Sequence, residues 1–174
     1  MNYLQNDKII LRKPEPEDLE FLYNIENNTK YWYLSETKAP FTKWHLKQHI
    51  ENSKYDIFTN KELRLIIELN NQNIQAGIID LFEYNPHNSN AGVGIIIEEK
   101  FRNEGIASDA LDMTIKYSFD FLLLHQLYCN IDKDNFASIK LFEKSGFKNT
   151  GTLKEWKKNK SGYTDVLLYQ LINK

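Results

Sequence analysis

The chain changes its hydrophobic period near residue 100, and this change limits the folds that it can adopt. Upstream, apolar residues gather in short runs at 64–69, 75–83 and 91–98, with polar turns between the runs. Downstream, apolar residues recur every three or four positions from Ala107 to Leu122. Short runs with turn residues between them are typical of strands, and the longer period is typical of an amphipathic helix. The pattern predicts an antiparallel meander that leads directly into a long helix.

The rest of the chain supplies further short elements. Two prolines, Pro14 and Pro16, stop an opening strand at 9–12, because proline cannot donate to a strand ladder. Gly146 is placed to close a helix in the left-handed conformation. The other expected elements are a helix from Glu17 to about 26, a Thr42-capped helix at 43–53, a strand at 126–132, a helix at 135–144, and a hairpin of 153–158 with 164–171. We therefore expect one mixed α/β domain over residues 1–174.

Composition narrows the functional classes. The 24 acidic and 22 basic side chains give a net charge of −2, which does not favour a nucleic-acid partner. The single cysteine, Cys129, can form neither an internal disulfide nor a metal cluster, so we expect no metal. No apolar run approaches the length of about 18 residues that suggests a membrane span. The first residues also lack the charged-then-apolar plan of a signal peptide, so we expect a cytoplasmic protein with no membrane partner.

The stretch from Ile95 to Ala107 carries the most chemical information. A buried strand leads into a loop, and the loop opens the long helix. Free N–H groups at a helix start favour an anion, particularly a phosphate. Gly105 and Ala107 are small enough for a ligand to approach the backbone, and Arg102 can add charge-assisted hydrogen bonds. On these residues alone, the alternative is an ordinary strand–helix turn that contains one glycine.

Four motifs in matching order resemble one family. The loop Arg102-x-x-Gly105-x-Ala107 resembles the acetyl-CoA pyrophosphate loop of the GNAT superfamily of N-acetyltransferases. Residues 135–147 resemble that superfamily's second signature, an Asn-x-x-Ser helix that ends in Gly-Phe. The hairpin segment 162–169 and the opening 11–19 are similar to the branch of ribosomal-protein N-terminal acetyltransferases and spermidine N-acetyltransferases. The resemblance covers residues 8–172.

This resemblance implies a GNAT fold, with a central, mostly antiparallel sheet flanked by about four helices. Two parallel strands, 91–98 and 126–132, would splay apart to admit the pantetheine arm of acetyl-CoA. Coenzyme binding would involve Ile95, Ile96 and Ile97 on the strand, the loop residues Arg102, Asn103, Glu104, Gly105, Ile106 and Ala107, and the helix residues Asn135, Ser138 and Lys140. A neutral amine would attack the thioester directly, so the enzyme must align the reactants, help to remove a proton and stabilise the oxyanion.

Two positions depart from the family pattern. Phe142 stands where many relatives have a tyrosine that protonates the leaving thiolate, and we expect it to be a core aromatic beside Phe147. Water, Ser138 or a neighbouring tyrosine could supply the proton instead. Gly92 stands where the polyamine enzymes have a glutamate. Asp80 is our first substitute for that carboxylate, with Glu83 as a second; the alternative for Asp80 is a solvated strand residue.

The first helical region suggests an acceptor site. Aromatic faces beside carboxylates suit a cationic amine, and the segment from residue 31 to 36 combines the two. The candidate substrate-binding residues are Glu26, Tyr31, Trp32, Glu36 and His49. Alternatively, these aromatics simply pack a helical lid.

These observations predict an acetyl-CoA-dependent N-acetyltransferase that acts on a small polyamine or diamine. A protein N-terminus and an aminoglycoside stay open as acceptors. A CoA-binding regulatory module without turnover also stays open, because the residues at 142 and 92 depart from the family pattern. A homo-oligomer is plausible, since edge strands of the terminal hairpin could pair between chains.

Overall fold

A single seven-stranded sheet organises the computed structural model, which describes residues 2–35, 37–70, 72–159 and 162–174. The strand order is β1-β2-β3-β4-β5-β7-β6. Every neighbouring pair is antiparallel except β4 and β5, which run parallel. The strands are β1 Ile9–Arg12, β2 Leu63–Leu69, β3 Ile74–Asn85, β4 Asn90–Ile97, β5 Gln126–Asp132, β6 Lys148–Asn159 and β7 Gly162–Ile172. The expected mixed α/β fold with a mostly antiparallel sheet is confirmed.

The described residues contain six α-helices rather than about four. They are α1 Leu19–Glu26, α2 Trp32–Ser35, α3 Lys43–Asn52, α4 Ile57–Asn60, α5 Ile106–Lys116 and α6 Phe136–Lys144. The two additional helices, α2 and α4, have four residues each. One helical turn is too short to display an apolar period, so hydrophobic spacing cannot reveal such helices.

The parallel strands β4 and β5 separate soon after they meet. They pair only at Asn90–Gln126, Ala91–Leu127 and Gly92–Tyr128. Beyond Gly92, β4 stays paired with β3 as far as Ile97, while β5 stays paired with β7 as far as Asp132. The β4 edge that faces β5 is therefore open from Val93 onward. This is the expected splay between two parallel strands.

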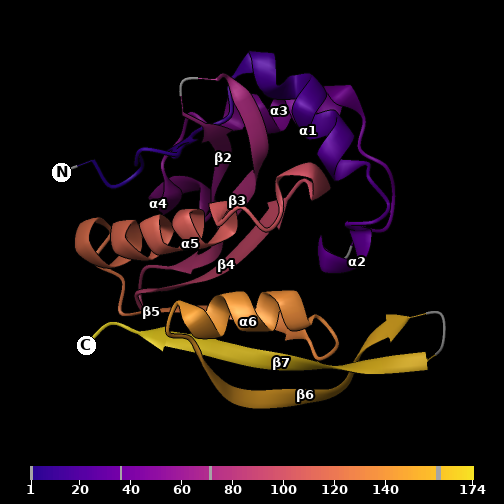
Figure 1. Ribbon diagram of the computed structural model, residues 1–174, viewed down its shortest axis with the longest axis vertical. Coiled ribbons are helices and arrows are strands. Elements are labelled where there is room, and N and C mark those ends of the chain that lie inside the picture. The colour runs from indigo at the N-terminus through magenta and orange to yellow at the C-terminus, as the bar shows by residue number, and fades with distance from the viewer. Residues whose placement is uncertain (1, 36, 71, 160–161) are drawn as a thin grey trace.

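Two apolar cores lie on opposite faces of the sheet. Leu22 of α1 and Leu46 of α3 pack with Ile66 and Ile78 on one face. The larger core joins α5 and α6 to the other face through alternate strand residues such as Leu65, Ile79 and Val93. Figure 1 shows α5 alongside β4 and α6 alongside β7, while α1 and α3 gather at the β2 end of the molecule.

Helix ends follow the expected capping residues. The side chain of Thr42 accepts a hydrogen bond from the His45 N–H at 3.1 Å, which caps α3. Gly146 has φ 93°, the left-handed conformation that ends α6. The boundary of β6 differs from expectation, because the strand begins at Lys148 rather than at Leu153. Its first residues are polar and exposed, so they carry no alternating signal.

Candidate active site

A cleft of about 290 Å³ lies where β4 and β5 separate. Its walls come from β4, from the loop before α5, from the N-terminal turn of α6 and from α2. The lining residues are Tyr33, Leu34, Ile95, Ile96, Ile97, Phe101, Arg102, Asn103, Gly105, Ile106, Ala107, Asn135, Ala137, Ser138 and Leu141. Ten of the residues expected to bind the coenzyme are among them, and the open β4 edge offers backbone groups to an extended ligand.

The α5 end of the cleft suits a phosphate. Gly105 caps α5 with φ 82°, a conformation that glycine adopts readily. The first N–H groups of the helix have no partner within it, and both Ile106 and Ala107 line the cleft. The Nε of Arg102 donates to the Ile97 carbonyl at 3.1 Å, and its guanidinium lies 5.6 Å from the centre of the Tyr31 ring. Arg102 is therefore held beside the helix start, where it can contact an anion.

The α6 end of the cleft presents polar groups. Asn135 caps α6 by accepting a hydrogen bond from the Ser138 N–H at 3.2 Å. Because only its oxygen is used as the cap, its side-chain NH₂ stays available as a donor. Two of the expected coenzyme residues, Glu104 and Lys140, are exposed and do not line the cleft. These observations fit a coenzyme whose pyrophosphate lies at α5 and whose pantetheine arm passes α6.

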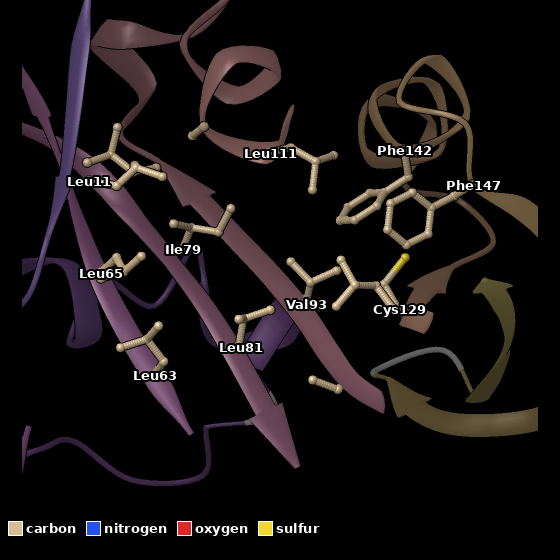
Figure 2. Close-up of a cluster of buried hydrophobic side chains, with 14 of the residues drawn as sticks. Leu11, Leu63, Leu65, Ile79, Leu81, Val93, Leu111, Cys129, Phe142 and Phe147 are labelled. Atoms are coloured by element: carbon tan, nitrogen blue, oxygen red, sulfur yellow. The ribbon is translucent and has the colours of Figure 1, made fainter. Parts of the chain in front are cut away.

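Two residues beneath the cleft cannot act on the substrate. Phe142 is 3% exposed, and its ring centre lies 5.0 Å from that of Phe147 in an edge-on contact. Figure 2 shows both rings pointing into the core toward Cys129. The expectation of a core aromatic at 142 is confirmed. Burial raises the pKa of Cys129 to about 12, so its thiol stays protonated and is a poor nucleophile.

Asp80 lies on the α1 side of the sheet in a cluster with Arg64 and Glu26. Its two carboxylate oxygens accept from Arg64 at 2.9 and 2.8 Å, and Glu26 forms a further ion pair with the same guanidinium. Burial lowers the pKa of Arg64, but the two carboxylates outweigh this effect and raise it above its usual range. Asp80 is thus held in a two-point ion pair with Arg64 rather than being a free carboxylate.

The other candidate substrate residues lie around the same cluster or under the loop before α5. Tyr31 is buried beneath Arg102, and the Trp32 indole N–H donates to the Glu26 carbonyl at 2.8 Å. His49 lines a second, smaller cavity of about 130 Å³ together with Glu62 and Arg64. Glu36 lies outside the described residues. Of the five, Tyr31 contacts a cleft residue, Arg102, whereas Glu26 pairs with Arg64 and His49 lies beside it.

The outer wall of the cleft belongs to the segment 31–36, which the sequence suggests for the acceptor, but its two lining residues are not among the candidates named there. Tyr33 and Leu34 of α2 line it, and Lys157 of β6 holds this wall in place. The Lys157 ammonium bonds to both carboxylate oxygens of Asp132, at 3.0 and 3.2 Å, and to the Tyr33 carbonyl. Lys157 lies in a lysine-rich run that looks like a solvated hairpin face, so no signal in the sequence distinguishes it.

The site, a splayed pair of parallel strands with an anion-binding helix start at one end of the gap, fits an acyltransferase that takes its acyl group from coenzyme A. A family model described as an acetyltransferase (GNAT) domain matches residues 8–148. The chain therefore belongs to the GNAT acetyltransferase family. It is an N-acetyltransferase, and acetyl-CoA is its acetyl donor.

Several characterised relatives cover most of the chain. The spermidine N(1)-acetyltransferase of Escherichia coli K12 is 31% identical over 149 residues, which are 82% of this chain and 74% of that protein. A crystal structure of spermidine N-acetyltransferase from Vibrio cholerae, in complex with CoA and spermine, has a TM-score of 0.86 at 27% identity and covers 96% of both chains. A dodecameric structure of the Vibrio cholerae enzyme in an intermediate state has a TM-score of 0.80 at 29% identity, over 96% of this chain and 95% of that one.

Proposed function

We propose that this N-acetyltransferase acetylates a primary amine of a small polyamine, with spermidine or spermine as the first candidates. One observation carries the proposal: the similarity to the Vibrio cholerae spermidine enzyme extends over nearly the whole of both chains. Glu26 and Asp80 share the one guanidinium of Arg64 on the α1 face of the sheet, so this cluster keeps one formal negative charge, which suits a cationic acceptor.

In this proposal the chain mainly aligns the reactants. Acetyl-CoA brings a thioester that an amine can attack without a covalent enzyme intermediate. Backbone groups of Ile95 to Ile97 hold the pantetheine arm in extended form, and the Asn135 side chain donates to it. Arg102 and the N–H groups at the start of α5 neutralise the pyrophosphate. Ser138, in the first turn of α6, is the proposed hydroxyl near the thioester that can assist the leaving thiolate.

The acceptor class is tested by thiol release from acetyl-CoA. The panel contains spermidine, spermine, putrescine, an aminoglycoside and short peptides with free N-termini. We expect turnover on the polyamines and little on the others. Turnover confined to peptides would mean that the acceptor is a protein N-terminus and not a polyamine. No turnover on any amine, combined with tight CoA binding, would favour a regulatory module that senses CoA.

The pyrophosphate assignment is tested by Arg102→Ala. We expect CoA affinity to fall by about tenfold or more, because charge-assisted hydrogen bonds contribute about 1.5–3 kcal/mol each. Lys100→Ala removes the same charge two residues away, where Lys100 pairs with Glu98, and it is the matched control. Titration calorimetry with CoA measures both. If the two variants bind CoA with equal affinity, Arg102 does not contact the pyrophosphate.

We also propose that the chain forms a homo-oligomer, as the dodecameric relative does. Light scattering coupled to gel filtration measures the mass directly. A monomer at micromolar concentration would contradict this.

A further inference from the structure

We propose that Glu83, held in place by Tyr128, binds the ammonium group of the acceptor before acetyl transfer. This inference rests on the proposed function, because it names the residues that receive the amine. It assigns a binding role to a pair of side chains at the point where β4 and β5 separate. The ligand class is a primary ammonium on an unbranched carbon chain.

The position of the pair follows from the strand register. Tyr128 lies opposite Gly92 in the last of the three β4–β5 pairs, so its backbone marks the closed end of the gap. Its hydroxyl donates to the Glu83 carboxylate at 2.5 Å and thereby reaches across β4 to β3. Glu83 has φ 50° within an irregular stretch of the β3–β4 pairing, between Phe82 and Asn85. Both residues thus lie at the closed end of the gap between β4 and β5, three positions along β4 from Ile95, the first strand residue of the cleft wall.

Charge distinguishes Glu83 from the other carboxylates of the sheet. In the described part of strands β1 to β5, the acidic residues are Glu68, Asp80, Glu83 and Asp132. Glu68 pairs with Arg12, Asp80 with Arg64, and Asp132 with Lys157. Among the same residues, Glu83 has a tyrosine hydroxyl as its partner and no cation within 4.0 Å. Among the described residues of these strands, Glu83 is therefore the carboxylate that has no cationic partner of its own.

The pair also presents the right hydrogen-bonding groups. Tyr128 uses its only hydrogen on Glu83, which leaves its oxygen free to accept. Burial, and then the hydrogen bond to Glu83, raise the pKa of Tyr128 above its usual range, so the phenol stays protonated and the pair carries one negative charge. A primary ammonium has three hydrogens to donate, and the phenol oxygen and the second Glu83 oxygen can accept two of them.

An aromatic wall adjoins these acceptors. The ring of Phe82 lies over Gly92 so closely that a Cβ there would be 2.3 Å from it. The same ring meets Tyr128 edge-on, with 6.0 Å between ring centres. Phe82 thus occupies the room above β4 that a glutamate at 92 would take, while Glu83 supplies a carboxylate beside it. Methylene groups next to the ammonium can pack on this ring, and aromatic faces attract cations.

The test compares Glu83→Gln with wild type in steady-state kinetics, using spermidine as the varied amine. We expect the KM for spermidine to rise at least tenfold while the KM for acetyl-CoA stays within twofold. Tyr128→Phe should raise the spermidine KM by a smaller factor, because the carboxylate remains but is no longer held. The matched control is Glu143→Gln, since Glu143 accepts from Tyr169 at 2.9 Å in a second Tyr–Glu pair between α6 and β7.

The possible outcomes separate the two proposals. Wild-type turnover on spermidine decides the proposed function, whereas the ratio of variant to wild-type KM decides the role of Glu83. An unchanged spermidine KM in Glu83→Gln would overturn the inference while leaving the acetyltransferase intact. An equal rise of the spermidine KM in Glu143→Gln would also overturn the inference, because the loss of any Tyr–Glu pair would then be enough to raise this KM. If the wild type acetylates only another amine of the panel, the same comparison is made with that amine.

Discussion

Gly92 lies directly beneath the ring of Phe82, and this contact determines which residues position 92 can hold. A Cβ at 92 would lie 2.3 Å from the ring, whereas a Cβ at Gly151 would meet nothing within 4 Å. We expect Gly92→Ala to lower the stability by about 1–3 kcal/mol, since overpacking displaces neighbouring groups. Gly151→Ala, on the exposed β6, should leave it nearly unchanged. Urea unfolding measures both, and equal stabilities would mean that Phe82 rotates away freely.

His49 should make stability depend on pH. Burial, reinforced by the charge of Arg64, lowers the pKa of His49 from its ordinary 6.5. The unfolded chain then binds more protons than the folded one as the pH falls through that ordinary value, so acid favours unfolding. We expect the Tm of His49→Gln to fall less than the Tm of the wild type when the pH is lowered from about 7.5 to 5.5. If the Tm of the two proteins falls equally over this range, other groups dominate the pH dependence of stability.

Single residues differ in how far the sequence reveals their surroundings. The buried position of Phe142 follows from helical spacing and the neighbouring Phe147, and it was predicted. The partner of Asp80 could not be predicted, because Arg64 reaches it only through the pairing of β2 with β3. Asp80 looks free in the sequence, but the register of β2 against β3 places the Arg64 guanidinium beside it, and the sequence does not display that register.

At the scale of elements, the short helix α2 depends on a distant strand. Lys157 of β6 bonds to the Tyr33 carbonyl and to Asp132 of β5, and so fastens the outer wall of the cleft. We expect Lys157→Met to raise the KM for acetyl-CoA several-fold, because Tyr33 lines the cleft. Lys154→Met removes a lysine that pairs with Asp165 instead, and should change it little. An acetyl-CoA KM that is equal in both variants would show that α2 holds its position unaided.

Elements with a long apolar period or a capping residue were predictable. The meander, α3, α5, β5 and α6 follow the hydrophobic spacing and the capping residues Thr42 and Gly146. The helix α2 was not predictable, since four residues cannot display a period. The start of β6 was missed for a similar reason, because its exposed polar residues resemble a loop.

At the scale of the whole molecule, one sheet draws its strands from residues 9–172, and this supports the proposal that residues 1–174 form a single domain. In the described ranges, no helix combines the length and apolarity needed to cross a bilayer. The cytoplasmic location stays a prediction.

Coenzyme binding should stabilise the junction between the two parts of the sheet. Strands β1–β4 and β5–β7 are joined by three residue pairs, and the cleft is lined by β4 on one side and by α6, which follows β5, on the other. We expect saturating CoA to raise the Tm by several degrees and to slow amide exchange in 95–97 and 102–107. Mass spectrometry after deuterium labelling resolves these segments. Slower exchange confined to the α1–α3 region would place the coenzyme elsewhere.

The same three pairs set how far the gap between β4 and β5 extends. A strand advances about 3.3 Å per residue. If the strands separated one residue earlier, the gap would therefore lengthen by about that distance. The extent of the gap is thus a property of strand register, set by the backbone and open to change by a shift of one pair.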